Sequence, residues 1–279
     1  MLIRECSDLH IDHHFASRSP ADDRFIEAFN RLLEPFPEDH ESVLIIAGDL
    51  APARSMQRIV SFISHACSRF KFVIYVLGNH EHYGSVMDET LPLIKKNLKL
   101  ENLIVVGNEP ELLYIDGVYF LLGTLWTDYN GPASFETHAY IKSYINDHRM
   151  ILNENGTGVQ PDQLIPIHEE TVSKFDEWLS IIDPSKAVIV THHMPSFSAV
   201  DPKYLQPGNR ASEAINHAFA TDLDWLMLER SPAYWCFGHT HTPYFGKVGD
   251  TQLICNPFGY PGEDNLKKGS YSPRLRFEL

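Results

Sequence analysis

The sequence predicts an α/β fold with mixed β-sheets, and three observations support this prediction. Short apolar runs rich in β-branched residues recur along the chain, as is typical of buried strands. Segments with helical periodicity lie between several of these runs, and this alternation indicates an α/β protein. Two turn signals built from Asp and Gly fall between apolar runs, so antiparallel hairpins are expected within the same sheets.

Each predicted element coincides with one of these patterns. Helical periodicity predicts helices over residues 56–70 and 161–182, and in the second a proline opens the run and Asp183-Pro184 closes it. The hairpin turns are expected at Asp116-Gly117 and Gly249-Asp250. The apolar runs predict strands over residues 1–6, 43–47, 71–77, 103–106, 118–122, 187–190 and 234–237.

One domain spanning residues 1–279 is expected. Hydrophobic residues at 43% and charged residues at 22% are ordinary for a globular chain, and no linker rich in Pro, Gly or Ser divides it. Residues 129–160 are the least regular part and include a predicted loop over 153–158. We interpret them as a cap or insertion over a site.

Charge and hydropathy restrict the class of partner. The longest apolar runs fall far short of the about 18 residues that span a bilayer, and charged residues interrupt the N-terminus before a signal peptide develops. A cytoplasmic protein without a membrane partner is therefore expected. The net charge of −14 disfavours binding to nucleic acid. The 4 cysteines show no CxxC spacing, which argues against a disulfide framework and a thiolate zinc site. The oligomeric state is not predicted.

Residues capable of binding metal follow several of the apolar runs. They occur in the blocks SDLH (7–10), AGDL (47–50), LGNHE (77–81), VTHH (190–193) and FGHTH (237–241). Taken singly, each block is a common turn or capping arrangement. Parallel strands deliver the residues at their carboxyl ends to one edge of a sheet, so remote blocks can converge there. Jointly, these Asp, Asn and His donors predict a metal site.

The ordered set D-x-H, G-D, G-N-H-E, T-H and G-H-x-H resembles the calcineurin-like metallophosphoesterase superfamily, from residue 7 to residue 241. The resemblance implies a four-layer α-β-β-α sandwich, in which two mixed β-sheets are flanked by helices, and a centre of two metal ions. It implies that one metal is held by Asp8, His10 and His241, and the second by Asn79, His192 and His239, with Asp49 bridging both. His80 is the implied general acid. His193 is the alternative to His192, because spacing alone does not choose between adjacent residues.

Further segments indicate which branch of the superfamily the chain resembles. GTLWTDY (123–129), NDHRMI (146–151), THHMPS (191–196) and CNPFGYPGE (255–263) are similar to a bacterial branch of the superfamily. The protein-phosphatase branch usually carries a GD-x-x-DRG block, whereas this chain has GDLAPAR. That difference argues against a phosphoprotein phosphatase.

The residue types suit hydrolysis of a phosphate ester. Two divalent cations beside two carboxylates, with neutral Asn and His as the other ligands, leave a positive surplus that attracts an anionic substrate. The implied reaction is attack of a metal-bridging hydroxide on a phosphomonoester or phosphodiester, with His80 protonating the leaving oxygen. Oxygen and nitrogen donors without thiolates suit Mn, Fe, Zn, Ni or Co, and we expect manganese. The partner is then a small phosphorylated substrate.

Two other functions compete with this one. The same fold could serve as a protein-interaction scaffold without turnover, but the complete set of implied ligands favours an enzyme. A nuclease would need a basic groove, which the acidic chain does not indicate.

Several residues near the motifs have open roles. Glu81 and His82 orient His80, contact the substrate or lie in a solvated loop. Five further residues are expected to line the pocket rim or, equally, to make local caps and surface pairs: Trp126, Asp128, Asp147, His148 and Arg149.

Overall fold

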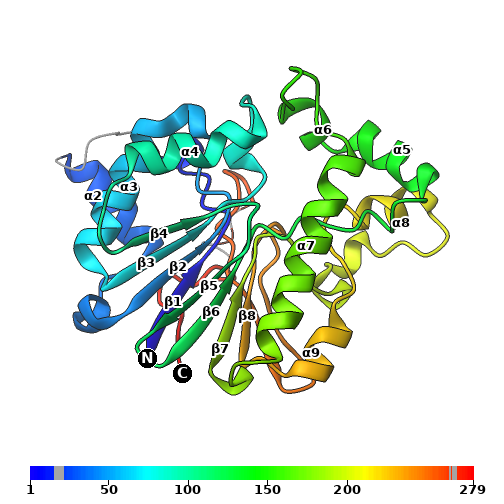
Figure 1. The fold of residues 1–279 in the computed structure, drawn as a ribbon. Coiled ribbons are helices and arrows are strands. Elements are labelled where there is room, and N and C mark those ends of the chain that lie inside the picture. The colour runs from blue at the N-terminus through cyan, green and yellow to red at the C-terminus, as the bar shows by residue number, and fades with distance from the viewer. Residues whose placement is uncertain (16–21, 264, 266–268) are drawn as a thin grey trace.

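Two β-sheets lie face to face, and helices cover the outer side of each (Figure 1). The computed structural model describes residues 1–15, 22–263, 265 and 269–279. Each predicted strand is present to within one residue at either end. The two chain ends lie side by side at the amino end of the first strand.

The first sheet has 5 strands in the order β11-β1-β2-β3-β4. β1 to β4 pair in parallel, and β11 joins the edge of β1 antiparallel. The three-residue β11 is too short to give a clear alternation and was not predicted. The strands are β1 (Leu2–Cys6), β2 (Val43–Ala47), β3 (Phe72–Val76), β4 (Leu103–Val106) and β11 (Arg276–Glu278).

The second sheet has 6 strands in the order β5-β6-β7-β8-β10-β9. β6, β7, β8 and β10 pair in parallel, whereas β5 and β9 pair antiparallel with β6 and β10. Both antiparallel pairs are joined at the predicted turns, Asp116-Gly117 and Gly249-Asp250. The strands are β5 (Glu111–Ile115), β6 (Val118–Leu122), β7 (Ala187–Val190), β8 (Tyr234–Cys236), β9 (Tyr244–Val248) and β10 (Thr251–Cys255).

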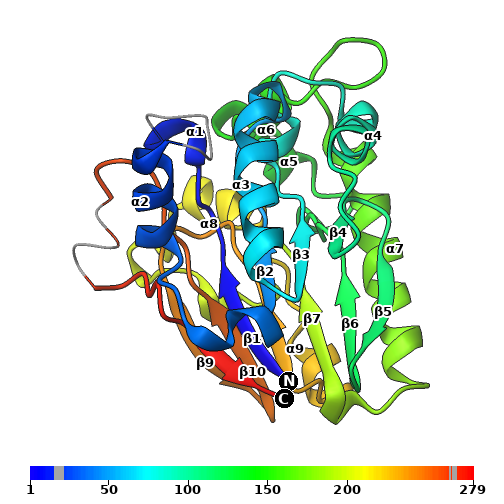
Figure 2. The same cartoon turned by 90° about the vertical axis from the view of Figure 1, so that its left-hand side faces the viewer.

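The helices divide between the two outer faces. Side chains of α2, α3 and α4 share one hydrophobic core with the first sheet, and α2 and α3 lie over its outer face (Figure 2). Side chains of α7 and α9 share another core with the second sheet. The helices are α1 (Ile11–His14), α2 (Asp23–Leu32), α3 (Met56–Arg69), α4 (Met87–Asn97), α5 (Phe135–Tyr144), α6 (Asp147–Met150), α7 (Pro161–Leu179), α8 (Arg210–Asn216) and α9 (Asp224–Arg230).

The side chains of β2 point alternately into two different cores, and this alternation shows how the layers form. Val43 and Ile45 are buried in a core between the two sheets, whereas Leu44 and Ile46 are buried in the core under the helices. Because successive side chains of a strand point to opposite faces, a strand that is apolar throughout is buried on both sides. The predicted four-layer α-β-β-α arrangement is confirmed.

Residues 129–160 are more regular than the sequence indicates. The predicted loop over 153–158 is present, but α5 and α6 lie within the same stretch. In α5 only Ile141 is fully buried, so the apolar residues do not form the stripe that identifies a helix in sequence. Across the described residues, no helix combines the length and the hydropathy needed to cross a membrane.

Candidate metal centre

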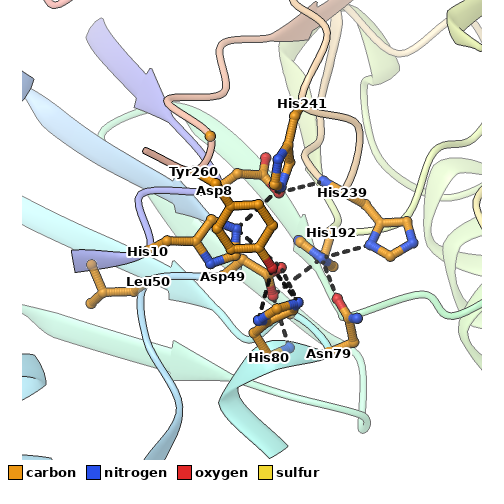
Figure 3. A network of polar contacts seen from close by, with 12 residues as sticks. Asp8, His10, Asp49, Leu50, Asn79, His80, His192, His239, His241 and Tyr260 are labelled. Carbon is orange, nitrogen blue, oxygen red and sulfur yellow. Dashed lines mark hydrogen bonds and ion pairs between the residues drawn. The ribbon is translucent and has the colours of Figure 1, made fainter. Parts of the chain in front are cut away.

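The metal-capable blocks meet at the carboxyl ends of the strands, at the opposite end of the sheets from the chain termini (Figure 1). Asp8 follows β1, Asp49 follows β2, and His192 follows β7. Figure 3 shows their side chains pointing toward one another, together with the other implied ligands. In the part of the chain that the structure describes, metal-capable atoms within 4.8 Å of one another form three groups: Asp8, His10 and His241; His10, Asp49 and His80; and Asp49, His192 and His239.

Backbone conformation at the strand ends makes this convergence possible. Asp8, Asp49 and His239 have left-handed φ angles of 50°, 55° and 67°, which residues other than Gly rarely adopt. Non-glycine residues in this region cluster at functional sites, where packing holds them in place. A Cβ atom at Gly78 would lie 2.2 Å from Oδ1 of Asp49, so the glycine of the GNHE block allows the two loops to approach.

The residues of the first group come from the segments that follow β1 and β8. Nε2 of His10 is 3.1 Å from Nε2 of His241, and Nε2 of His241 is 3.7 Å from Oδ1 of Asp8. Glu263 accepts a hydrogen bond from Nδ1 of His241 at 2.7 Å. In the neutral ring, this bond leaves the lone pair of His241 on Nε2, facing His10 and Asp8.

The third group surrounds His192. Its Nδ1 donates to the carbonyl oxygen of Ala47 at 3.0 Å, so in the neutral ring Nε2 carries the lone pair. Around Nε2 lie Oδ1 of Asn79 at 2.9 Å, Nδ1 of His239 at 3.2 Å and Oδ1 of Asp49 at 3.4 Å. Electron-pair donors thus converge on one point.

His193 directs its Nδ1 atom to a different partner. Its Nδ1 lies 3.2 Å from the carbonyl oxygen of Thr124, and its ring packs against Trp126 with centroids 4.9 Å apart. His193 belongs to none of the metal-capable groups found among the described residues. Of the two adjacent histidines, His192 is the one that faces the centre.

The donor set fits divalent cations. Asp8 is fully buried, and its Oδ2 has no hydrogen-bond partner among the described residues. Burial raises the pKa of Asp8 to about 6 and that of Asp49 to about 8. Carboxylates in such a place ionise at neutral pH when a compensating positive charge is present. A cation supplies that charge and satisfies the facing lone pairs of the histidines.

His80 lies at the edge of the centre. Its backbone N–H donates to Oδ1 of Asp49 at 2.9 Å, and its ring stacks on Tyr83 with centroids 4.1 Å apart. The hydroxyl of Tyr260 is 3.0 Å from Nε2 of His80. Burial lowers the pKa of His80 to about 4, against the opposing effect of Asp147. The neutral ring still carries one N–H that can be donated.

Glu81 does not serve any of the roles considered from the sequence. It is fully buried and accepts hydrogen bonds from the backbone N–H groups of Leu50 at 2.7 Å, Gly78 at 2.7 Å and Asp49 at 3.1 Å. Tyr75 adds its hydroxyl at 2.8 Å. Glu81 therefore joins the loop after β2 to the loop after β3. It is not exposed to solvent, and among the described residues no hydrogen bond links its carboxylate to the His80 ring.

A comparison with protein families decides the assignment. The family model described as calcineurin-like phosphoesterase matches residues 1–243. The chain belongs to the calcineurin-like phosphoesterase family. It is thus a metal-dependent hydrolase of phosphate esters, and clusters of His and Asp that can hold metal lie in the matched region.

A solved structure shows the same fold. Phosphopantetheinyl hydrolase from Mycobacterium tuberculosis has a TM-score of 0.67 and 18% identity, with 97% of this chain and 93% of that chain covered. A Staphylococcus aureus protein assigned as a 5′-nucleotidase has a TM-score of 0.44 and 17% identity, with 93% and 48% covered. The search of curated proteins finds no match.

Three residues contact the candidate metal centre in ways that the sequence did not predict. Asp147 accepts a hydrogen bond from Asn79, Glu263 accepts one from His241, and Tyr260 contacts His80. Asp147 was considered only for the pocket rim. Tyr260 and Glu263 lie beyond the matched region, in the segment 255–263 that resembles the bacterial branch. The resemblance of that segment to the bacterial branch was the signal in the sequence, but it predicted no role for either residue.

A cavity of about 440 Å³ opens over the phosphoesterase centre. Asp49, Asn79 and His80 lie on its wall, together with Asp147. Among the described residues considered for the rim, Asp147 alone lines it, because Trp126 is buried in a separate core and Asp128 bonds to Thr221.

Proposed function

We propose that this phosphoesterase hydrolyses a small phosphomonoester or phosphodiester at two divalent cations. One cation would be held by Asp8, His10 and His241, and the other by Asn79, His192 and His239, with Asp49 shared between them. The convergence of donors on His192 is the observation that carries the proposal. When bound, the cations activate a water molecule and offset the negative charge of the phosphoryl oxygens.

The position of Asp49 supports its shared role. Its Oδ1 lies 3.4 Å from Nε2 of His192, in the group that also contains His239. Its Oδ2 lies 3.8 Å from Nε2 of His10, whose own Nε2 faces His241 in the first group. The two oxygens of one carboxylate thus face both groups, as a bridging ligand requires.

His80 is proposed to donate a proton to the leaving oxygen. It lines the cavity beside Asp49 and Asn79, and it belongs to neither proposed ligand set. Burial lowers the pKa of His80, whereas the negative charge of a bound phosphate raises it again, so substrate binding favours the protonated ring. Tyr260 is proposed to position this ring, because its hydroxyl contacts Nε2. Manganese as the metal and the cytoplasm as the compartment are further parts of the proposal.

Metal analysis and turnover test the proposal together. We expect purified protein loaded with Mn²⁺ to hold about two ions per chain and to hydrolyse p-nitrophenyl phosphate or its bis ester. Asp49→Asn should lose metal and activity together, while its circular dichroism spectrum stays that of the unmodified chain. Relative rates on the monoester and the diester would identify the preferred class. A loaded protein that hydrolyses neither would contradict the proposal.

A further inference from the structure

The cavity over the metal centre has two chemically different sides. Its volume of about 440 Å³ suits a small organic group. One side carries the polar residues of the proposed centre and its surroundings. The rest of the lining includes apolar and aromatic residues from segments outside the two sheets, which we call the apolar side: Tyr144, Ile145, Val200, Tyr204, Ile215 and Phe219.

The apolar side comes from two stretches of chain that pack together. Tyr144 ends α5 and Ile145 follows it, whereas Ile215 belongs to α8. α5 and α8 contact each other and lie near one another in Figure 1. Tyr144 is 60% exposed and Tyr204 is 53% exposed, so both rings are accessible at the cavity mouth. Large apolar side chains left exposed around a cavity are typical of a ligand site.

The carboxylates near this side are already engaged by the protein. Asp147 accepts hydrogen bonds from Asn79 at 2.8 Å and from Tyr83 at 2.6 Å. Asp201 accepts from the hydroxyl of Thr242 at 2.9 Å and pairs with Lys203 at 3.0 Å. The negative charge of these groups opposes a second anionic group on the ligand.

We propose that the apolar side of the cavity binds the organic group of the substrate, and that this group is uncharged and apolar, such as an alkyl chain or an aryl ring. This inference rests on the proposed function, because the phosphoryl group would lie at the Asp49 end of the cavity. Transfer of apolar surface from water to this wall supplies the binding free energy. The segments that carry the wall would thereby select the substrate.

A series of phosphonates tests the inference without turnover. Titration calorimetry on Mn²⁺-loaded protein would measure the affinity of methyl-, butyl- and hexylphosphonate. Burial of each added methylene should strengthen binding roughly fourfold until the wall is covered. A hexylphosphonate with a terminal carboxylate should bind at least about tenfold more weakly than hexylphosphonate. The same preparation would be assayed on p-nitrophenyl phosphate.

A matched pair of variants locates the effect. Ile215→Asn keeps the size of the side chain but makes the wall polar, so hexylphosphonate should bind about tenfold more weakly while methylphosphonate is unaffected. Ile181→Asn is the control, because Ile181 is 74% exposed and does not line the cavity.

The outcomes distinguish the two proposals. One outcome is that methylphosphonate binds while neither the length of the alkyl chain nor Ile215→Asn changes the affinity of the phosphonates. In that case the inference of an apolar subsite is wrong and the proposed function is unaffected. If no phosphonate binds and p-nitrophenyl phosphate is not hydrolysed, the proposed function fails and the subsite fails with it.

Discussion

Asp147 accepts a hydrogen bond from Nδ2 of Asn79 at 2.8 Å, and this contact sets the direction of the Asn79 amide. With Nδ2 directed to Asp147, Oδ1 points to Nε2 of His192 at 2.9 Å. Asp147 also accepts the hydroxyl of Tyr83, and it is 2% exposed. It therefore orients a proposed ligand from outside the ligand set, as carboxylates around metal centres commonly do.

Asp147→Ala should weaken metal binding. Loss of the acceptor frees the Asn79 amide to turn, so the affinity for the second cation should fall about 10- to 100-fold. Metal content after dialysis against dilute Mn²⁺ would measure the change. Asp147→Asn keeps one acceptor oxygen and should lose less, and Glu154→Ala removes an exposed carboxylate as a control. Equal metal content in all of these variants would exclude the orienting role.

Gly78→Ala should displace Asp49. The new Cβ would lie 2.2 Å from Oδ1 of Asp49 and 2.8 Å from Cε1 of His192, closer than packed atoms approach. Both proposed ligands must then move, so we expect at least a tenfold loss of metal affinity and a lower melting temperature. Gly107→Ala is the matched control, because its nearest neighbour would be 3.4 Å away. Full metal occupancy in the Gly78 variant would show that the loops have more freedom than the contacts indicate.

His80→Ala should keep both metals and lose turnover. The ring belongs to neither proposed ligand set, and a general acid typically contributes about 10²- to 10⁴-fold to the rate. The loss in kcat should be larger for an alkyl phosphate than for p-nitrophenyl phosphate, because a poor leaving group needs the proton more. Unchanged kcat on the alkyl ester would remove His80 from the mechanism.

Tyr260→Phe should act through His80. The substitution removes the hydroxyl that contacts Nε2 of His80 but retains the ring that stacks on His10 with centroids 4.2 Å apart. Loss of one such hydrogen bond should lower kcat about tenfold, with metal content unchanged. In the His80→Ala background the same substitution should have no further effect, since coupled residues are not additive. Additive losses would assign Tyr260 a role independent of His80.

The sequence predicted the residues of the centre better than the contacts that hold them. Asp8, Asp49 and His192 could be found because each follows an apolar run, and parallel strands bring such positions to one edge. The choice between His192 and His193 depends on which ring reaches the carbonyl of Ala47, a contact between β2 and β7 that spacing does not encode.

The supporting residues were harder to predict for the same physical reason. Glu81 stands beside His80 in sequence, which suggested a role at its side, yet its carboxylate turns inward to the loops after β2 and β3. Tyr260 and Glu263 reach the centre from the loop that follows β10. Side-chain direction and loop path, rather than residue type, determine these contacts.

The stability of the metal-free protein should fall as pH rises from 7 to 8.5. Burial raises the pKa of Asp49 to about 8, far above that of an unfolded carboxyl, so the folded state binds this proton more tightly. The resulting stabilisation is complete at pH values below the unfolded pKa and is lost as pH rises through about 8. Between pH 7 and 8.5 the loss is on the order of 1 kcal/mol, or about 2–4 °C in melting temperature.

Thermal unfolding in the presence of a chelator, and again with Mn²⁺, would measure this loss. Asp49→Asn has no proton to lose and should show a flatter pH profile without metal. Mn²⁺ should raise the melting temperature of the unmodified chain more at pH 8.5 than at pH 7, because metal ligands bind in their deprotonated form. An equal fall with pH in the Asp49→Asn variant would assign the pH dependence to other groups, and an equal Mn²⁺ effect at both pH values would contradict the buried, protonated state of Asp49.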